Sequence, residues 1–297
     1  MRKLFAWIGA NENLNFLLTN RIPRQSLTLL FGRLSQIRHP LFSRLSIALW
    51  KRMADLHLEE AAQTTFASVH ECFIRELKPG ARPIDPDPDV LSSPCDGIVG
   101  ACGTVERGQL IQAKGFPYTL HDLLQDQVLC EHYRDGMYIT LRISASMYHR
   151  FHAPQDCTVD GLTYISGDTW NVNPVALKRV ERLFCKNERA VIQCRLARGG
   201  HRVTLVPVAA VLVASIRLHF ANVLLHLKYR GPNRIACHAD LAKGEEMGWF
   251  QHGSTIIVFA PAGFALAPGI ASGMHIRMGQ ALLRLPHAVE PESHQPA

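Results

Sequence analysis

Three short stretches of the chain carry side chains that can move protons or attack a carbonyl group. Asp96 lies in a Pro-Cys-Asp-Gly turn sequence that leads into a run of β-type residues. His149 and His152 stand three residues apart, directly after another such run, and Ser254 opens a third run near the C-terminus. These are the parts of a triad in which an acid orients an imidazole and the imidazole removes the hydroxyl proton.

Each stretch also has an ordinary interpretation. Asp-Gly and Gly-Ser pairs are common in turns, and a chain with 15 histidines places many of them at its surface. The pair His149 and His152 has a spacing found among zinc ligands, but no third ligand stands at a recognisable distance, so we expect no metal. A serine hydrolase remains open, although Ser254 is not in the Gly-x-Ser-x-Gly elbow that one hydrolase fold uses.

The composition is that of a folded protein with a core. Hydrophobic residues make up 47% and charged residues 19% of 297 residues, which argues against disorder. The eight cysteines are scattered without a Cys-x-x-Cys pair, which predicts buried thiols in a reducing compartment rather than a disulfide framework. We find no signal peptide and no convincing membrane span, so the protein is expected to be soluble or peripheral.

The positive charge is concentrated at the N-terminus. Residues 1–56 hold nine Lys and Arg side chains against Glu12 and Asp55, which accounts for the formal net charge of the whole chain, +7. Apolar residues recur there at helical spacing, in 27–37 and again in 42–53, with arginines and lysines beside them. Such helices suit an anionic bilayer, but their apolar stripes fit packing against the protein equally well. The charge favours the bilayer.

The remainder of the chain is predicted to be rich in β-structure. A further helical piece at 66–77 and a turn-rich connector precede the β-type runs, which are 97–105, 137–143, 159–165, 202–217 and 255–259. The best later helical patterns are 120–129 and 174–183. We therefore expect an α+β fold in which basic amphipathic N-terminal helices, the membrane-associating region 1–63, are attached to a β-rich catalytic core, 64–297.

Taken together, the motifs resemble those of phosphatidylserine decarboxylase proenzymes. Phe250-x-x-Gly253-Ser254-Thr255 is similar to the self-cleavage motif of that family, and the likeness extends from about residue 64 to residue 280. The other blocks in the family's order are Phe73–Ile84, Pro94–Gly97, Gln112–Gly115, Tyr148–His152, Gly167-Asp168, Val172-Asn173, Lys186–Arg189 and Lys243–Gly248. The chain departs from its relatives at His252, where an apolar residue or glycine is usual.

The resemblance implies two reactions at one serine. Ser254 attacks the carbonyl of Gly253, with His152 as the base and Asp96 orienting it, and β-elimination then separates a β chain, 1–253, from an α chain, 254–297. The α chain begins with a pyruvoyl group, the covalent cofactor. That group forms a Schiff base with phosphatidylserine, takes up electrons as CO2 leaves and yields phosphatidylethanolamine. His149 is our choice for the group that returns a proton to the product.

The same resemblance predicts the partners and the location. We expect phosphatidylserine in an anionic membrane as substrate, an α/β pair that forms a dimer of such pairs, and no nucleic acid. We expect the protein to be bound peripherally at the cytoplasmic side of a bacterial cell membrane. Two further functions remain open besides the hydrolase: a pyruvoyl enzyme that decarboxylates a soluble amino acid, and a lipid-binding protein that has lost cleavage, for which His252 is the reason.

Overall fold

The computed structural model describes residues 11–286 except 55, 114–115, 213–214 and 252–253. Its helices are α2 Glu12–Asn20, α3 Arg24–Leu34, α4 Pro40–Met53, α5 Val69–Phe73, α6 Leu120–Leu124, α7 Gln127–His132, α8 Pro174–Leu177 and α9 Leu183–Lys186. Its strands are β1 Val90–Ser92, β2 Gly97–Thr104, β3 Gln109–Ala113, β4 Phe116–Thr119, β5 Met137–Ile143, β6 Arg150–His152, β7 Cys157–Ile165, β8 Arg189–Leu196, β9 Arg202–Val208, β10 Ile216–Leu218, β11 Val223–Leu225, β12 Arg234–Ile235, β13 Ala239–Leu241, β14 Glu246–Phe250, β15 Ser254–Ala260, β16 Ala265–Leu266, β17 His275–Ile276 and β18 Ala281–Arg284.

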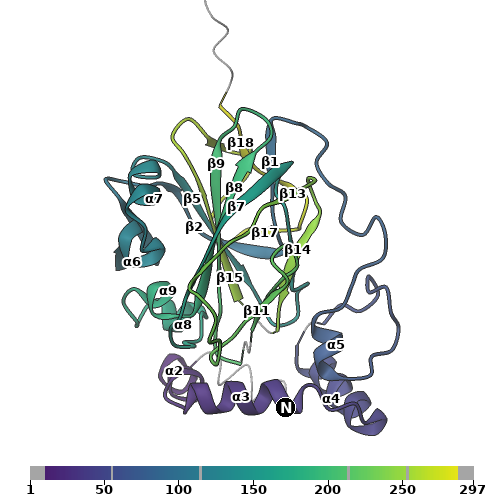
Figure 1. The fold of residues 1–297 in the computed structure, drawn as a ribbon. Coiled ribbons are helices and arrows are strands. Elements are labelled where there is room, and N and C mark those ends of the chain that lie inside the picture. Colours follow the sequence, from purple (N-terminus) through teal and green to yellow (C-terminus); the bar gives the residue numbers. More distant parts are fainter. Residues whose placement is uncertain (1–10, 55, 114–115, 213–214, 252–253, 287–297) are drawn as a thin grey trace, which may run out of the picture.

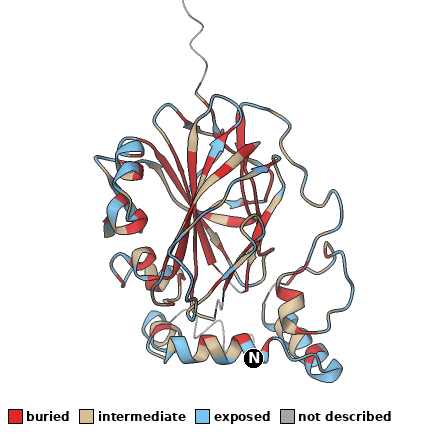
Figure 2. Ribbon diagram, in the orientation of Figure 1, coloured by how far each residue is buried: buried red, intermediate tan, exposed pale blue. Residues whose placement is uncertain are grey.

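Most strands belong to one large antiparallel sheet. Its order is β12-β7-β8-β9-β15-β5-β2-β17, with β13 also paired to β7, and a smaller sheet has the order β11-β10-β14-β6. Helices α6 to α9 flank the large sheet, whereas β14 and β11 lie on the other side of it (Figure 1). Every residue of the central strand β15 is buried, and β-branched residues fill its middle. Buried residues are concentrated in the strands (Figure 2).

The expected α+β class is confirmed, with N-terminal helices followed by antiparallel sheets. The run 137–143 is β5 itself, and 255–259 lies within β15. The expectation of one strand over 202–217 was wrong, because the chain leaves the large sheet after Val208 and joins the smaller sheet at Ile216. The single helix expected over 120–129 was also wrong, since Gln125 adopts a left-handed conformation and Asp126 caps a new helix.

Helices α2 to α4 cross one end of the large sheet (Figure 1). Arg24 of α3 forms an ion pair with Asp168 at 2.5 Å and lies over the ring of Trp170. The hydroxyl of Thr28 accepts a hydrogen bond from the amide of Leu212 at 2.9 Å. The buried residues of α3 and α4 are small, namely Thr28, Gly32 and Ser43. Polar anchors thus hold α3 to the loops at the end of the sheet.

Candidate active site

Two crossings between the sheets bring the predicted site residues into one region. Strand β5 continues through residues 144–149 into β6, and β14 continues through 251–253 into β15. Because β5 pairs with β15 and β6 pairs with β14, the strand ends that the two crossings connect lie next to each other. The amide of Phe250, at the end of β14, donates to the carbonyl of His149 at 3.0 Å. This bond places His149 beside the end of β14, four residues before Ser254.

Ser254 begins the central strand of the large sheet. It pairs with Ile143 of β5, and its side chain is fully buried. Within the described part of the chain, its Oγ has no hydrogen-bond partner, which is unusual for a buried hydroxyl. A hydroxyl without a hydrogen-bond partner is free to react as a nucleophile or to bond with a substrate. Gly253, the other half of the predicted cleavage site, and its neighbour His252 lie outside the described residues.

His152 is buried and held at both ring nitrogens. Its Nδ1 donates to the carbonyl of Gly244 at 2.9 Å, so its Nε2 accepts from the hydroxyl of Tyr148 at 3.0 Å. Burial is the largest cause that lowers the pKa of His152 below its ordinary value of 6.5. The ring is therefore neutral at neutral pH, with Nε2 as its basic nitrogen. The carbonyl of Gly244 is the group that orients it.

Asp96 is held in a different way from the predicted triad acid. Arg82 donates to both of its carboxylate oxygens, at 2.8 and 2.6 Å, and the amide of Met278 donates to Oδ1 at 2.9 Å. Its loop still reaches His152, whose amide donates to the carbonyl of Pro94 at 2.8 Å. Among themselves, Asp96, His152 and Ser254, which are all described, form no direct hydrogen bond. Burial is the main cause that lowers the pKa of His152, and the charge of Asp96 opposes this shift only as one of several smaller effects.

His149 is fully buried, and its ring centroid lies 4.2 Å from that of Phe73. Arg75 binds the segment that precedes His149. Its guanidinium donates hydrogen bonds to the carbonyls of Ser146 and Met147 at 3.0 and 3.2 Å. The sequence pattern pointed to His149 itself. It did not point to Phe73 or Arg75 as its neighbours, because only the pairing of distant segments brings them there.

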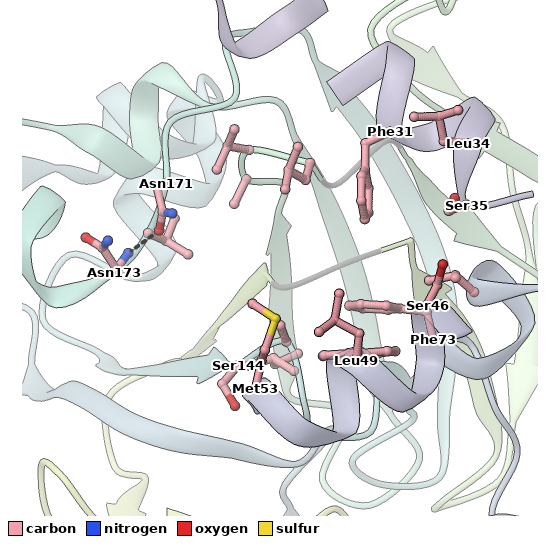
Figure 3. A pocket seen from close by; sticks show the side chains of 18 of the residues that line it. Phe31, Leu34, Ser35, Ser46, Leu49, Met53, Phe73, Ser144, Asn171 and Asn173 are labelled. Atoms are coloured by element: carbon pink, nitrogen blue, oxygen red, sulfur yellow. Dashed lines mark hydrogen bonds between the residues drawn. The ribbon is translucent and has the colours of Figure 1, made fainter. Parts of the chain in front are cut away.

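An apolar cavity of about 540 Å³ adjoins this region. Figure 3 shows Phe31 and Leu34 of α3 on one side, Leu49 and Met53 of α4 on another, and Phe73 beside them. Ile143, which pairs with Ser254, also lines the cavity. The sequence marked the helical residues as an apolar stripe, but periodicity does not say that such residues enclose a space. Among the described residues, no group of three or more His, Cys, Asp or Glu side chains is arranged to hold a metal ion.

Glu188 is a buried acid two strands away from Ser254. The amide of Ala209 donates to the carbonyl of Glu188, and β9, which Ala209 follows, pairs with β15. The hydroxyl of Tyr164 donates to Oε2 at 2.7 Å, whereas Oε1 has no partner within the described part of the chain. Burial is the main cause that raises the pKa of Glu188 from 4.5 to about 7.

This raised pKa predicts a pH-dependent stability. The folded state binds the proton of Glu188 more tightly than the unfolded state does. The stability that this proton contributes to the folded state is complete below the unfolded pKa and is lost as the pH rises through about 7. We expect Glu188→Gln to remove this loss and to be more stable than its parent at about pH 8, by on the order of 3 kcal/mol. Thermal unfolding of unprocessed Ser254→Ala protein, with and without Glu188→Gln, at about pH 5 and pH 8 measures it. Parallel pH profiles for the two proteins would contradict the assignment.

Comparison with known proteins identifies the family. The family model described as phosphatidylserine decarboxylase matches residues 69–284. The chain is 33% identical over 282 residues to the phosphatidylserine decarboxylase proenzyme of Dickeya dadantii, covering 91% of this chain and 92% of that protein. It is 36% identical over 270 residues to the proenzyme of Vibrio cholerae, covering 87% and 94%, and 33% identical over 271 residues to that of Brevibacillus brevis, covering 89% and 95%. The chain belongs to the phosphatidylserine decarboxylase family.

Proposed function

We propose that Ser254 is the residue at which this proenzyme cleaves itself and the residue from which its pyruvoyl group is made. The family's reaction is the decarboxylation of phosphatidylserine to phosphatidylethanolamine after self-cleavage. The observation that carries the assignment to Ser254 is the position of its buried Oγ at the start of β15, directly after Gly253 of the motif. As far as the described residues go, this oxygen has no hydrogen-bond partner, which is also true of Ser215 and Thr255. The residues around it fit a group built from this side chain, because they enclose it and leave its oxygen without a competing bond.

Self-cleavage then follows from residues of this chain. Ser254 Oγ gives its proton to His152 Nε2, once the Tyr148 hydroxyl has yielded that position, and attacks the carbonyl of Gly253. The amide becomes an ester, and loss of the Ser254 α-proton breaks the ester bond to oxygen. This elimination leaves a carboxylate on Gly253 and a dehydroalanine at position 254. The dehydroalanine then takes up one water and releases one ammonia, which gives the pyruvoyl group. The charge of Asp96, held by Arg82, stabilises the imidazolium form of His152 during the first step.

Decarboxylation uses the second histidine. The pyruvoyl group supplies a carbonyl that takes up the electrons released when CO2 leaves the substrate. His149 is bonded through its carbonyl to the amide of Phe250, four residues before Ser254, and is shielded from water, so it is placed to return a proton to the substrate carbon. The apolar cavity next to Ile143 is suited to part of an acyl chain, because most of its lining surface is apolar.

The substrate class is tested by measuring CO2 release. Purified protein is offered phosphatidylserine in vesicles and, separately, free serine. We expect release from the lipid and none above background from the amino acid, since the apolar cavity has nothing to bind in free serine. Release from free serine alone would overturn the lipid assignment in favour of a decarboxylase for soluble amino acids.

The N-terminal helices are proposed to hold the protein on the cytoplasmic face of a bacterial membrane. No helix among the described residues is long and apolar enough to cross a bilayer. Instead, α4 turns Leu41 and Leu45 outward, 65% and 71% exposed, while Ser43 and Trp50 face the protein. The net positive charge of residues 1–56 attracts anionic lipid. The eight cysteines are free, which suits a reducing compartment.

This arrangement divides the chain into a membrane-associating region, 1–63, and a catalytic core, 64–297. The anionic surface that the region contacts is lipid and not nucleic acid, because exposed leucines accompany its charges. After cleavage, the β and α chains stay associated through the pairing of β15 with β5 and β9. We further propose that two such α/β pairs form a dimer, by analogy with the family.

Replacing both Leu41 and Leu45 with aspartate is expected to weaken binding to anionic vesicles on the order of 100-fold, because the bound protein no longer inserts these two leucines into the bilayer surface. Both side chains are exposed, so folding and self-cleavage should persist. Vesicle co-sedimentation measures the binding, and a denaturing gel measures the cleavage. Val128→Asp on α7, where Val128 is 70% exposed, is the matched control and should bind as the unaltered protein does. Equal binding by all three proteins would refute the anchor.

A further inference from the structure

An aromatic stack connects helix α4 to His149. The rings of Trp50 and Phe73 are nearly parallel, with centroids 4.9 Å apart and an interplanar angle of 9°. On its other side, Phe73 lies 4.2 Å from the imidazole of His149. Phe73 and His149 are buried, and Trp50 and Phe73 both line the apolar cavity. A residue of the amphipathic helix is thus two ring contacts away from the proposed proton donor.

Polar contacts tie α5 to the loop that carries His149. Arg75, directly after α5, is buried and donates to the carbonyls of Cys72, Ser146 and Met147 at 3.2, 3.0 and 3.2 Å. In the opposite direction, Arg150 Nε donates to the carbonyl of Ile74 at 2.8 Å. Because these bonds flank His149 on both sides in the sequence, α5 and the His149 loop form one connected unit.

The two amphipathic helices are in turn tied to α5 and the residues before it. Ser43 Oγ of α4 donates to the carbonyl of Ala67 at 2.7 Å, and the amide of His70 donates to the carbonyl of Ser35 at 2.8 Å. The opposite face of α4 carries the exposed Leu41 and Leu45. The same short helix that presents apolar residues to the outside therefore reaches the active site through Trp50, Phe73 and α5.

We propose that Trp50 and Phe73 are positioning residues that set the orientation of the His149 ring, so that seating of α4 on the bilayer is coupled to decarboxylation. This rests on the role proposed above for His149. Phe73 limits the rotation of the imidazole by direct contact, and Trp50 holds Phe73 in place by stacking on it. Self-cleavage depends on Ser254 and His152, and the ring of His152 packs on Tyr148 rather than on the stack. We therefore expect the coupling to act on the second reaction and to leave the first alone.

The test separates positioning from membrane binding by using a substrate that needs no membrane. Trp50→Ala and Trp50→Phe are compared with the unaltered protein on a short-chain phosphatidylserine below its micelle concentration. We expect both variants to cleave themselves fully on a denaturing gel. We expect kcat of Trp50→Ala to fall on the order of 10-fold, because a small displacement of a catalytic group has effects of at least this size, and Trp50→Phe to restore most of it. Wild-type kcat for Trp50→Ala on this substrate would overturn the proposal and make Trp50 a membrane contact alone.

A double substitution shows whether the effect passes through His149. In a His149→Ala background, Trp50→Ala should reduce the residual kcat no further, because the ring that it positions is gone. A full additional 10-fold loss in that background would contradict the coupling while leaving the role of His149 intact. Conversely, His149→Ala with unchanged decarboxylation would refute the proposed role of His149 itself, so the two failures are told apart.

Discussion

Alanine at position 254 is expected to leave the protein as one chain of 33.2 kDa that releases no CO2 from phosphatidylserine. The substitution removes the oxygen that attacks the preceding carbonyl, and with it the origin of the pyruvoyl group. Thr255, the next residue of β15, also carries a buried hydroxyl, but its own preceding carbonyl is that of residue 254, so it does not replace Ser254 in the attack on Gly253. A denaturing gel and a CO2-release assay on the same preparation measure both consequences.

Ser215 provides the matched control. It is also buried, and its Oγ likewise has no hydrogen-bond partner among the residues described. Ser215→Ala removes the same atom from a comparable environment and should still give two chains with full activity. If Ser254→Ala were also cleaved, the position of the nucleophile would be wrong. If Ser215→Ala were the variant that failed to cleave, the nucleophile would have to be sought there.

The two histidines are expected to separate the two reactions. His152→Ala should slow self-cleavage on the order of 10²- to 10⁴-fold, because Ser254 loses its base. His149→Ala should cleave normally and then slow decarboxylation by a similar factor, because the product carbon loses its proton donor. His121→Ala, at an exposed position on α6, should change neither reaction. The reverse pattern, with cleavage lost in His149→Ala and kept in His152→Ala, would contradict the assignment.

The lowered pKa of His152 adds a pH dependence to this experiment. Burial lowers the pKa of His152 below its ordinary value of 6.5, so the ring is neutral and can act as a base at neutral pH. The rate of self-cleavage should therefore be constant at neutral and mildly alkaline pH and fall only below that value. The rate of chain separation, followed on gels over a pH series, gives the profile.

The sequence predicted the elements that carry the chemistry better than the contacts between them. Strand β5 was predicted at its observed boundaries because seven β-type residues form an unbroken run. The exit of the chain after Val208 was missed because residues 209–215 are as apolar as the strand before them. Pro207 does not mark the end of the strand either, since it lies within β9 opposite Ile256.

Partners of the site residues were beyond sequence reasoning for a physical reason. The group that orients His152 is the backbone carbonyl of Gly244, and a carbonyl has no sequence signature. Arg82 binds Asp96 across a turn whose geometry sets the contact. Helical periodicity marked an apolar stripe on α4, but it did not reveal that Trp50 would turn inward while Leu45 faces outward.

Intact masses of the unaltered protein under denaturing conditions decide whether Ser254 becomes the pyruvoyl group. We expect two chains: residues 1–253 with a free carboxylate, and residues 254–297 lighter by one ammonia than a peptide beginning with serine. A small chain that keeps an intact N-terminal serine would show cleavage without pyruvoyl formation. Either that result or a single uncleaved chain of 33.2 kDa from active protein would contradict the account.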